Sequence, residues 1–287
     1  MKLKNKKFII TSLTIIALLA ITVIQIGKNS GNQEETILTS SQGLSNKKIG
    51  WGIKRNDNHE QPDLGKVNKE ILEKNNGIAM GNNNDKYIYL TFDEGYEAGH
   101  TTQILSTLKE NNVKATFFMT GGWVDSYPDM VKEICSRGHD LGNHSHNHKQ
   151  MSKLSASEQK DEIMYVTDKV KELTGYDVFL FRPPYGDYNS TLINTVYGCN
   201  HYPIQWDVDS LDWRDYGVEN IIKTVTNHKA LGNGSIILMH NGAKYTAKAL
   251  GTVIETLQSQ GYTFIPISEM IIRDNFHMDG TGRQIAD

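Results

Sequence analysis

The stretch YIYLTFDEG, residues 87–95, places an apolar run directly before two adjacent carboxylates and a glycine. Its aromatic and β-branched residues favour a buried β-strand over Tyr87–Phe92. Asp93 and Glu94 then fall on a turn, where neighbouring side chains can point in different directions. Such a turn is often merely a solvated acidic loop, but the apolar strand before it favours a functional pair.

Outward from this stretch, short β-rich runs alternate with longer amphipathic segments, which predicts a parallel sheet with right-handed crossovers. The expected strands are Tyr87–Phe92, Ala115–Met119, His139–Asn143, Val178–Arg182, Tyr202–Asp207, Ser235–Met239 and Tyr262–Pro266. The expected helices lie near Thr101–Asn111, Pro128–Arg137, Ser155–Thr174, Ser190–Val196, Val218–Lys229 and Tyr245–Gln260.

Polar residues stand at or just past the ends of these strands. In a barrel, the carboxyl ends converge on one mouth, whereas an open doubly wound sheet spreads them along a crevice. The pattern therefore favours an α/β fold with a distorted, incomplete (β/α) barrel of about seven parallel strands. The residues concerned are Asp93, Glu94, His144, Arg182, Asp209 and His240.

The amino end predicts a membrane anchor. Residues 8–27 form an uncharged, largely apolar run preceded by four lysines, long enough to cross a bilayer as a helix. The lysines predict a cytoplasmic amino end and a catalytic body outside the cell membrane, with the developing spore envelope as one possible location. A cleaved signal peptide is the alternative, but the run ends without an A-x-A cleavage site.

Composition divides the rest of the chain. Residues 1–27 are read as the lysine-rich end and transmembrane anchor, and 28–48, rich in Ser, Asn, Gln and Gly, as a linker. Residues 49–86 are read as an extension packed on the catalytic domain, which occupies 87–287 and includes a C-terminal tail.

Charge and cysteine content exclude several classes of protein. The net charge is −3, and the four lysines before the apolar run leave the remainder more acidic still. An acidic body lacks the basic surface that nucleic acid requires. Two cysteines cannot form a disulfide scaffold. Cys135 and Cys199 either pair in an oxidising compartment or remain inert thiols.

Three further segments combine residues suited to catalysis. In HSHNH, residues 144–148, His144 and His148 stand four apart, so on a helical turn they share a face and can bind one metal. Surface or core histidines also explain such pairs. In RPPYG, residues 182–186, two prolines break the chain where Arg182 emerges from its strand. IILMHN, residues 236–241, ends an apolar strand in His240.

The motifs TFDEG, HSHNH, RPPYG, DSLDW and ILMH occur in this order within residues 87–272. Together they resemble the polysaccharide deacetylases of carbohydrate esterase family 4, the NodB homology domain. GWGIK at 50–54 and YEAG at 96–99 are more narrowly similar to the spore-cortex de-N-acetylases that form muramic δ-lactam.

The resemblance implies metal-assisted hydrolysis of an acetamide on a glycan, with a divalent metal, expected to be Zn²⁺, as cofactor. It implies Asp93 as general base, Arg182 as the partner that orients it, His240 as general acid and Asp212 as the partner of this histidine. It assigns His144, His148 and Glu94 to the metal, the backbone N–H of Tyr185 to the oxyanion, and Trp213 and Leu238 to the substrate pocket.

Glu94 departs from the family pattern, which has Asp as a metal ligand at this position. Glutamate is longer by one methylene, so ligation needs a different rotamer, a backbone shift or a bridging water. The implied substrate is the peptidoglycan glycan strand, at N-acetylmuramic acid. N-acetylglucosamine is the alternative substrate, and a non-catalytic glycan-binding scaffold is the alternative from another class. Retention of Asp93, Arg182, Asp212 and His240 argues against the scaffold.

Overall fold

The structure is a computed structural model that describes residues 78, 80–81, 85–95, 99–279 and 281–287. The expected anchor at 1–27, the linker at 28–48 and nearly all of the extension at 49–86 lie outside these ranges. Residues 96–98, which carry most of the YEAG motif, lie outside them too. Within the described ranges no helix has the length and apolar character needed to cross a bilayer.

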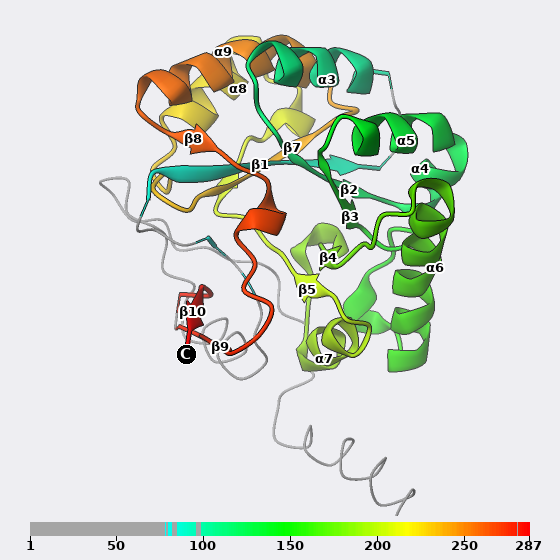
Figure 1. The fold of residues 1–287 in the computed structure, drawn as a ribbon. Coiled ribbons are helices and arrows are strands. Elements are labelled where there is room, and N and C mark those ends of the chain that lie inside the picture. The colour runs from blue at the N-terminus through cyan, green and yellow to red at the C-terminus, as the bar shows by residue number, and fades with distance from the viewer. Residues whose placement is uncertain (1–77, 79, 82–84, 96–98, 280) are drawn as a thin grey trace, which may run out of the picture. The chain divides into compact units, whose positions relative to one another are not determined.

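Seven parallel strands form a half-barrel, in the order β5-β4-β3-β2-β1-β7-β6 (Figure 1). An eighth strand, β8, pairs in parallel with the start of β1. This confirms the predicted incomplete (β/α) barrel. The strands are β1 (Tyr87–Glu94), β2 (Thr116–Met119), β3 (Asp140–Asn143), β4 (Leu180–Phe181), β5 (Tyr202–Pro203), β6 (Val208–Asp209), β7 (Ile236–His240) and β8 (Thr263–Phe264).

The expected strand at Tyr202–Asp207 was wrong in its extent. The chain leaves the sheet after Pro203 and returns only at Val208, so residues 202–209 supply two short strands at opposite ends of the strand order. β5 pairs with β4, and β6 pairs with β7. Because β5 and β6 pair with different neighbours, the barrel stays incomplete at this position.

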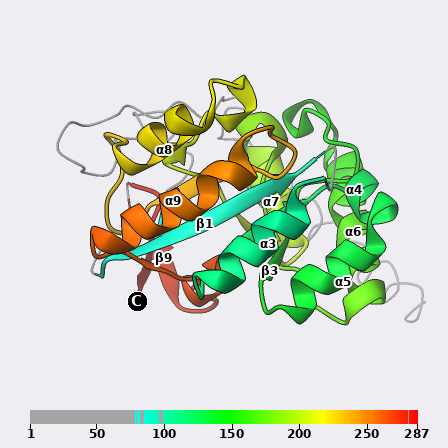
Figure 2. The ribbon, with the colours of Figure 1, turned by 90° about the horizontal axis from the view of Figure 1, so that it is seen from above.

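Helices cover the outer face of the half-barrel, and α3 and α9 lie over β1 (Figure 2). Local signals in the sequence fix their ends: a reciprocal Ser155–Glu158 capping box begins α6, and Gly175, at a φ of 73°, ends it. The helices are α3 (Thr101–Glu110), α4 (Gly121–Ser126), α5 (Pro128–Ser136), α6 (Ala156–Thr174), α7 (Ser190–Gly198), α8 (Val218–Thr226) and α9 (Thr246–Ser259). Of these, α4 was not predicted.

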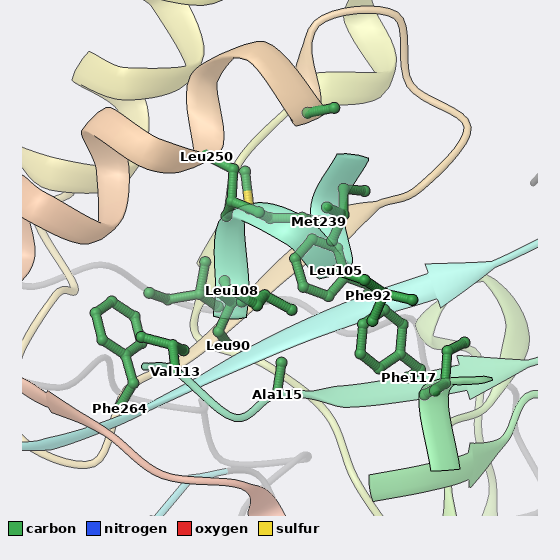
Figure 3. Packing of buried hydrophobic residues seen from close by; sticks show 14 of the residues in the cluster. Leu90, Phe92, Leu105, Leu108, Val113, Ala115, Phe117, Met239, Leu250 and Phe264 are labelled. Carbon is green, nitrogen blue, oxygen red and sulfur yellow. The ribbon is translucent and has the colours of Figure 1, made fainter. Parts of the chain in front are cut away.

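The two faces of β1 have different surroundings. Leu90 and Phe92 point outward into the main core, where α3 and α9 pack on them (Figure 3). Ile88 belongs to the same core cluster. Successive side chains of a strand alternate between faces, so Thr91 and Asp93 point into the half-barrel. The apolar run seen in the sequence is therefore a strand buried on both faces, and its carboxyl end carries polar groups into the interior.

The C-terminal tail adds a hairpin of β9 (Phe276–Met278) and β10 (Gln284–Ala286), which the sequence analysis did not predict. Arg283 joins this hairpin to the upstream segment, because its Nε donates to the carbonyl of Gly81 at 3.0 Å. Cys135 and Cys199 are free thiols, so the optional disulfide does not form in this structure.

Candidate active site

The end of β1 carries a fully buried ion pair. Nη1 of Arg182 donates to Oδ1 of Asp93 and to Oγ1 of Thr91, both at 2.8 Å. Nη2 of the same guanidinium donates to the carbonyl of Gln205 at 3.2 Å. The guanidinium also lies over the ring of Phe118, 4.1 Å from its centroid. Arg182 is thus held in one position, and with it the carboxylate that it binds.

The surroundings of Asp93 keep it ionised. Burial acts to raise its pKa, but the charge of Arg182, with that of His240, lowers the pKa below its usual value. A buried carboxylate held ionised beside a histidine pair is a suitable acceptor for a proton from water.

His144 lies at the end of β3 beside this carboxylate. Its Nδ1–H donates to the carbonyl of Arg182 at 2.8 Å, which directs Nε2 toward Asp93, 3.5 Å from Oδ2. The ring of His148 packs edge-on against that of His144, with 4.9 Å between centroids. The predicted histidine pair therefore meets at the site.

The expected helical turn over this pair was wrong. Ser145 and His148 have φ values of 66° and 51°, and the segment is a loop. Asn143 fixes the first bend by accepting from the backbone N–H of Ser145, and Ser145 Oγ accepts from the N–H of His148. Side-chain to backbone hydrogen bonds replace the helical ones and still bring the two imidazoles together.

Burial keeps both imidazoles neutral, as metal ligands must be. It lowers the pKa of His144, and it lowers the pKa of His148 to about 4. The hydrogen bond from His144 to the Arg182 carbonyl is the kind of contact that orients a ligating histidine. Two of the three expected ligands thus fit a metal such as Zn²⁺.

Glu94 does not join them. Its side chain follows Phe92 onto the outer face of β1, where Oε2 accepts from Oγ1 of Thr101 at 3.3 Å. In the part of the chain that the structure describes, no three His, Cys, Asp or Glu side chains are grouped to hold a metal ion. The expected three-ligand set is therefore not brought together, because the Glu94 carboxylate packs against Thr101 and not beside the histidines.

A second carboxylate–cation pair lies on the neighbouring strand. His240 at the end of β7 is the register partner of Asp93 on β1. Its Nδ1–H donates to Oδ1 of Asp212 at 2.8 Å, and its backbone N–H donates to Oδ2 at 2.7 Å. Thr246 Oγ1 also donates to Oδ2 of Asp212, at 2.6 Å. Three donors therefore hold the buried carboxylate of Asp212.

This pair favours a protonated histidine. Burial acts to lower the pKa of His240, but the hydrogen bond and charge of Asp212 raise it above the usual value. The imidazole side chain remains 31% exposed, so a substrate can reach it. A protonated, accessible histidine beside a buried carboxylate can act as a general acid.

The remaining predicted residues surround the mouth. Tyr185, 59% exposed, has a φ of 62°, and its ring lies 4.6 Å from that of His148. Trp213 is 54% exposed and stands next to Asp212 in the chain. Leu238 is nearly buried on β7, on the same face as His240. The mouth thus offers exposed aromatic rings, which can contact the apolar faces of sugars.

Several supporting residues were missed by the sequence analysis. Thr91 and the Gln205 carbonyl hold Arg182, and Thr246 holds Asp212. The position of Thr91 within the apolar strand, on the same face as Asp93, could have revealed it. Thr246 opens a helix far along the chain from Asp212, and no local pattern marks its partner.

Comparison with known proteins agrees with this geometry. Residues 80–202 match the polysaccharide deacetylase family model. The chain is 33% identical over 246 residues to peptidoglycan-N-acetylmuramic acid deacetylase PdaA of Bacillus subtilis, which covers 83% of this chain and 91% of that protein. The chain belongs to the polysaccharide deacetylase family.

The chain is thus an enzyme of carbohydrate esterase family 4, as the motifs predicted, with named deacetylases among its relatives. The solved structure of B. subtilis PdaA superposes with a TM-score of 0.73 at 35% identity, over 79% of this chain and 98% of that one. A peptidoglycan-N-acetylglucosamine deacetylase of Bacillus cereus is 34% identical over 206 residues, covering 69% of this chain and 73% of the relative.

One structural neighbour is described as a pseudoenzyme. This Bacillus anthracis member of the same esterase family superposes with a TM-score of 0.65 at 29% identity, over 73% of this chain and 70% of that one. The fold alone does not guarantee activity, and in this chain the Asp93–Arg182 and His240–Asp212 pairs supply the groups that catalysis needs.

Proposed function

We propose that the protein removes the acetyl group from N-acetylmuramic acid in peptidoglycan, which frees the amine needed for muramic δ-lactam in spore cortex. The observation that carries a deacetylation is the placement of the Asp93–Arg182 pair beside the His240–Asp212 pair, on adjacent parallel strands. The muramic substrate is supported by the extent of likeness to PdaA, which spans 83% of this chain against 69% for the glucosamine deacetylase of B. cereus.

In this proposal Asp93 accepts a proton from the attacking water, and the new C–O bond forms at the acetamide carbon. The backbone N–H of Tyr185 donates to the resulting oxyanion, an interaction typically worth about 2.7–4 kcal/mol. His240 then protonates the nitrogen as the C–N bond breaks. The products are acetate and a free sugar amine. Trp213 and Leu238 border the sugar and the acetyl methyl.

A divalent metal, expected to be Zn²⁺, belongs to the same proposal. His144 and His148 would hold it, since both are neutral, adjacent and directed toward the site. When bound, such an ion polarises the acetyl carbonyl and lowers the pKa of water.

We also propose that residues 8–27 anchor the protein in the cell membrane, with the catalytic domain on the outer side. The lysines before this apolar run and its length support the orientation. Membrane extraction of the native protein tests this directly. Retention after carbonate washing is expected, whereas a soluble form with a new amino terminus near residue 28 would overturn the anchor.

The substrate is tested by incubating the full-length chain and Zn²⁺ with three substrates: stem-free glycan strands, intact peptidoglycan and chitin oligosaccharides. We expect acetate release from the stem-free strands and, by mass spectrometry, free amines on muramic acid. Free amines on glucosamine alone would favour the alternative substrate. Binding to the strands with no acetate release from any substrate would favour the non-catalytic scaffold.

A further inference from the structure

The residue at the family's metal-ligand position serves a different set of partners here. Glu94 is completely buried on the outer face of β1, beneath the first turn of α3. The two side chains that it meets, Thr101 and Asn241, are buried as well. Buried polar side chains need one another as hydrogen-bond partners, so this trio is a structural unit distinct from the histidine pair.

The hydrogen bonds of the trio run in one direction, from Asn241 to Thr101 and from Thr101 to Glu94. Oγ1 of Thr101 donates to Oε2 of Glu94 at 3.3 Å and accepts from Nδ2 of Asn241 at 3.0 Å. The hydroxyl of Thr101 thus links the side chain of Asn241 to the Glu94 carboxyl group. Glu94 therefore joins three elements: the end of β1, the start of α3 and the turn after β7.

That turn carries the general acid. Asn241 directly follows His240, whose backbone N–H and ring are held on the other side by Asp212. His240 thus sits between two anchors, Asp212 through its own atoms and Glu94 through the next residue. Its register partner on β1 is Asp93, the neighbour of Glu94 in sequence. A movement of the turn would change the distance between base and acid.

The backbone of Glu94 is fixed independently. Its carbonyl accepts from the N–H of Thr120 at 3.1 Å and from Oγ1 of the same residue at 3.3 Å. Substituting the Glu94 side chain therefore leaves the main chain of β1 held, and its effects pass through Thr101 and Asn241.

We propose that Glu94 is a positioning residue and not a metal ligand: through Thr101 and Asn241 it holds the turn that sets His240 opposite Asp93. The expected change in kcat rests on the proposed deacetylation. The zinc affinity and the NMR signal of His240 can be measured whether or not that function is correct. Misplacing a catalytic group by about 1 Å commonly costs on the order of 10²-fold in rate.

The experiment compares Glu94→Gln, Glu94→Ala and Thr101→Val in the full-length chain, with Thr102→Val at the exposed next position as control. Zinc affinity is measured by titrating the apo-protein, and kcat and KM are measured by acetate release at saturating zinc. We expect all four variants to bind zinc within about 2-fold of wild type, since no metal ligand is touched, whereas loss of a direct ligand should weaken zinc binding by at least the roughly 10–100-fold that changes around a ligand cost.

The catalytic readout separates positioning from general damage. Glu94→Gln keeps the size and hydrogen-bonding capacity of the side chain, so we expect it to retain most of kcat. Glu94→Ala and Thr101→Val should lower kcat by about 10–100-fold with little change in KM. In both, the NMR signal of the His240 Nδ1–H proton, observed without zinc, should shift or broaden. Thr102→Val should leave all these properties unchanged.

The proposal would be overturned, and Glu94 would be a ligand, if Glu94→Gln and Glu94→Ala bound zinc about 10-fold or more weakly than wild type while Thr101→Val did not. An unchanged His240 signal in Thr101→Val would also overturn it. If Glu94→Ala fails to fold, Thr101→Val and Glu94→Gln still decide the question. Absence of acetate release from wild type would refute the proposed function, while the zinc and NMR results would still test the role of Glu94.

Discussion

The site contains two carboxylate–cation pairs, one around the base Asp93 and one around the acid His240. The two pairs differ in which member, the cation or the carboxylate, is the more exposed. At β1, Arg182 is fully buried, and the side chain of Asp93 keeps 8% of its surface exposed. At β7, the carboxylate of Asp212 is the enclosed member, and the cation, His240, remains partly open to the mouth. In each pair, the fully buried residue fixes the charge of the one that reacts.

This difference gives the two halves opposite protonation states at one pH. Arg182 offsets the burial of Asp93 and lowers its pKa, so the base is ionised above that lowered value. Asp212 offsets the burial of His240 and raises its pKa, so the acid stays protonated until the pH rises through that raised value. Between the two pKa values, an ionised base and a protonated acid coexist.

The largest expected effect comes from breaking the base half. Arg182→Met leaves the buried Asp93 without its cation, which should destabilise the fold by about 3–5 kcal/mol and abolish activity. Urea unfolding measures the loss. Arg137→Met, which removes a partly exposed ion pair with Glu133, is the matched control and should cost less than about 1 kcal/mol.

The sign of the pH dependence sharpens this prediction. In wild type, the lowered pKa of Asp93 contributes stability that is lost as the pH falls through the folded-state value. Without Arg182, burial dominates and raises the pKa of Asp93, so Arg182→Met should be destabilised more at neutral pH than near pH 4. A loss that is equal at both pH values would mean that the pair does not set the charge of Asp93.

The next effect separates proton transfer from metal binding within the base half. Asp93→Asn keeps the shape of the side chain but removes the acceptor, so kcat should fall by about 10²–10⁴-fold. Zinc content, measured by atomic absorption, should stay near that of wild type, because the assigned ligands are His144 and His148. A parallel loss of zinc and activity would place Asp93 among the ligands.

A third effect tests the histidine pair. His148→Ala should lose most of the bound zinc, and activity should return only at much higher zinc concentrations. His146→Ala is the matched control, since its ring stacks on Tyr165 with 3.5 Å between centroids instead of joining the pair. Zinc titration with acetate release reports both. Equal zinc affinity in the two variants would remove His148 from the site.

The smallest effect concerns the mouth. The guanidinium of Arg214 lies 4.6 Å from the Trp213 ring centroid, and both side chains are exposed beside Asp212. If Arg214 pairs with the lactyl carboxylate of the proposed muramic substrate, Arg214→Ala should raise KM several-fold for stem-free strands, with kcat preserved and little effect on chitin oligosaccharides. Equal changes on both substrates would show that Arg214 does not distinguish muramic acid.

Much of the fold was predictable because its signals are local. The apolar strand before Asp93, the capping box of α6 and the alternation of strands and helices all lie within short windows of sequence. The division of residues 202–209 into β5 and β6 was not predictable. β5 pairs with β4 and β6 pairs with β7, and both partners lie far away in the sequence.

The site divides in the same way. The motifs led to Asp93, Arg182, His144, His148, Asp212 and His240, which the structure brings together. The contact of Glu94 with Thr101 was not predicted, because it depends on how α3 packs over the end of β1. The loop geometry of HSHNH depends on Asn143 and Ser145 side chains, whose backbone bonds override the spacing rule for a helix.

The most direct test of the two-pair account is the pH dependence of kcat/KM for acetate release at saturating zinc, in wild type and in Asp212→Asn. The account predicts a bell-shaped profile for wild type. In Asp212→Asn the basic limb should move to lower pH, because His240 loses the charge that raises its pKa, while the acid limb stays in place. A basic limb that does not move, or an acid limb that moves with it, would contradict the assignment of His240 as the acid and Asp93 as the base.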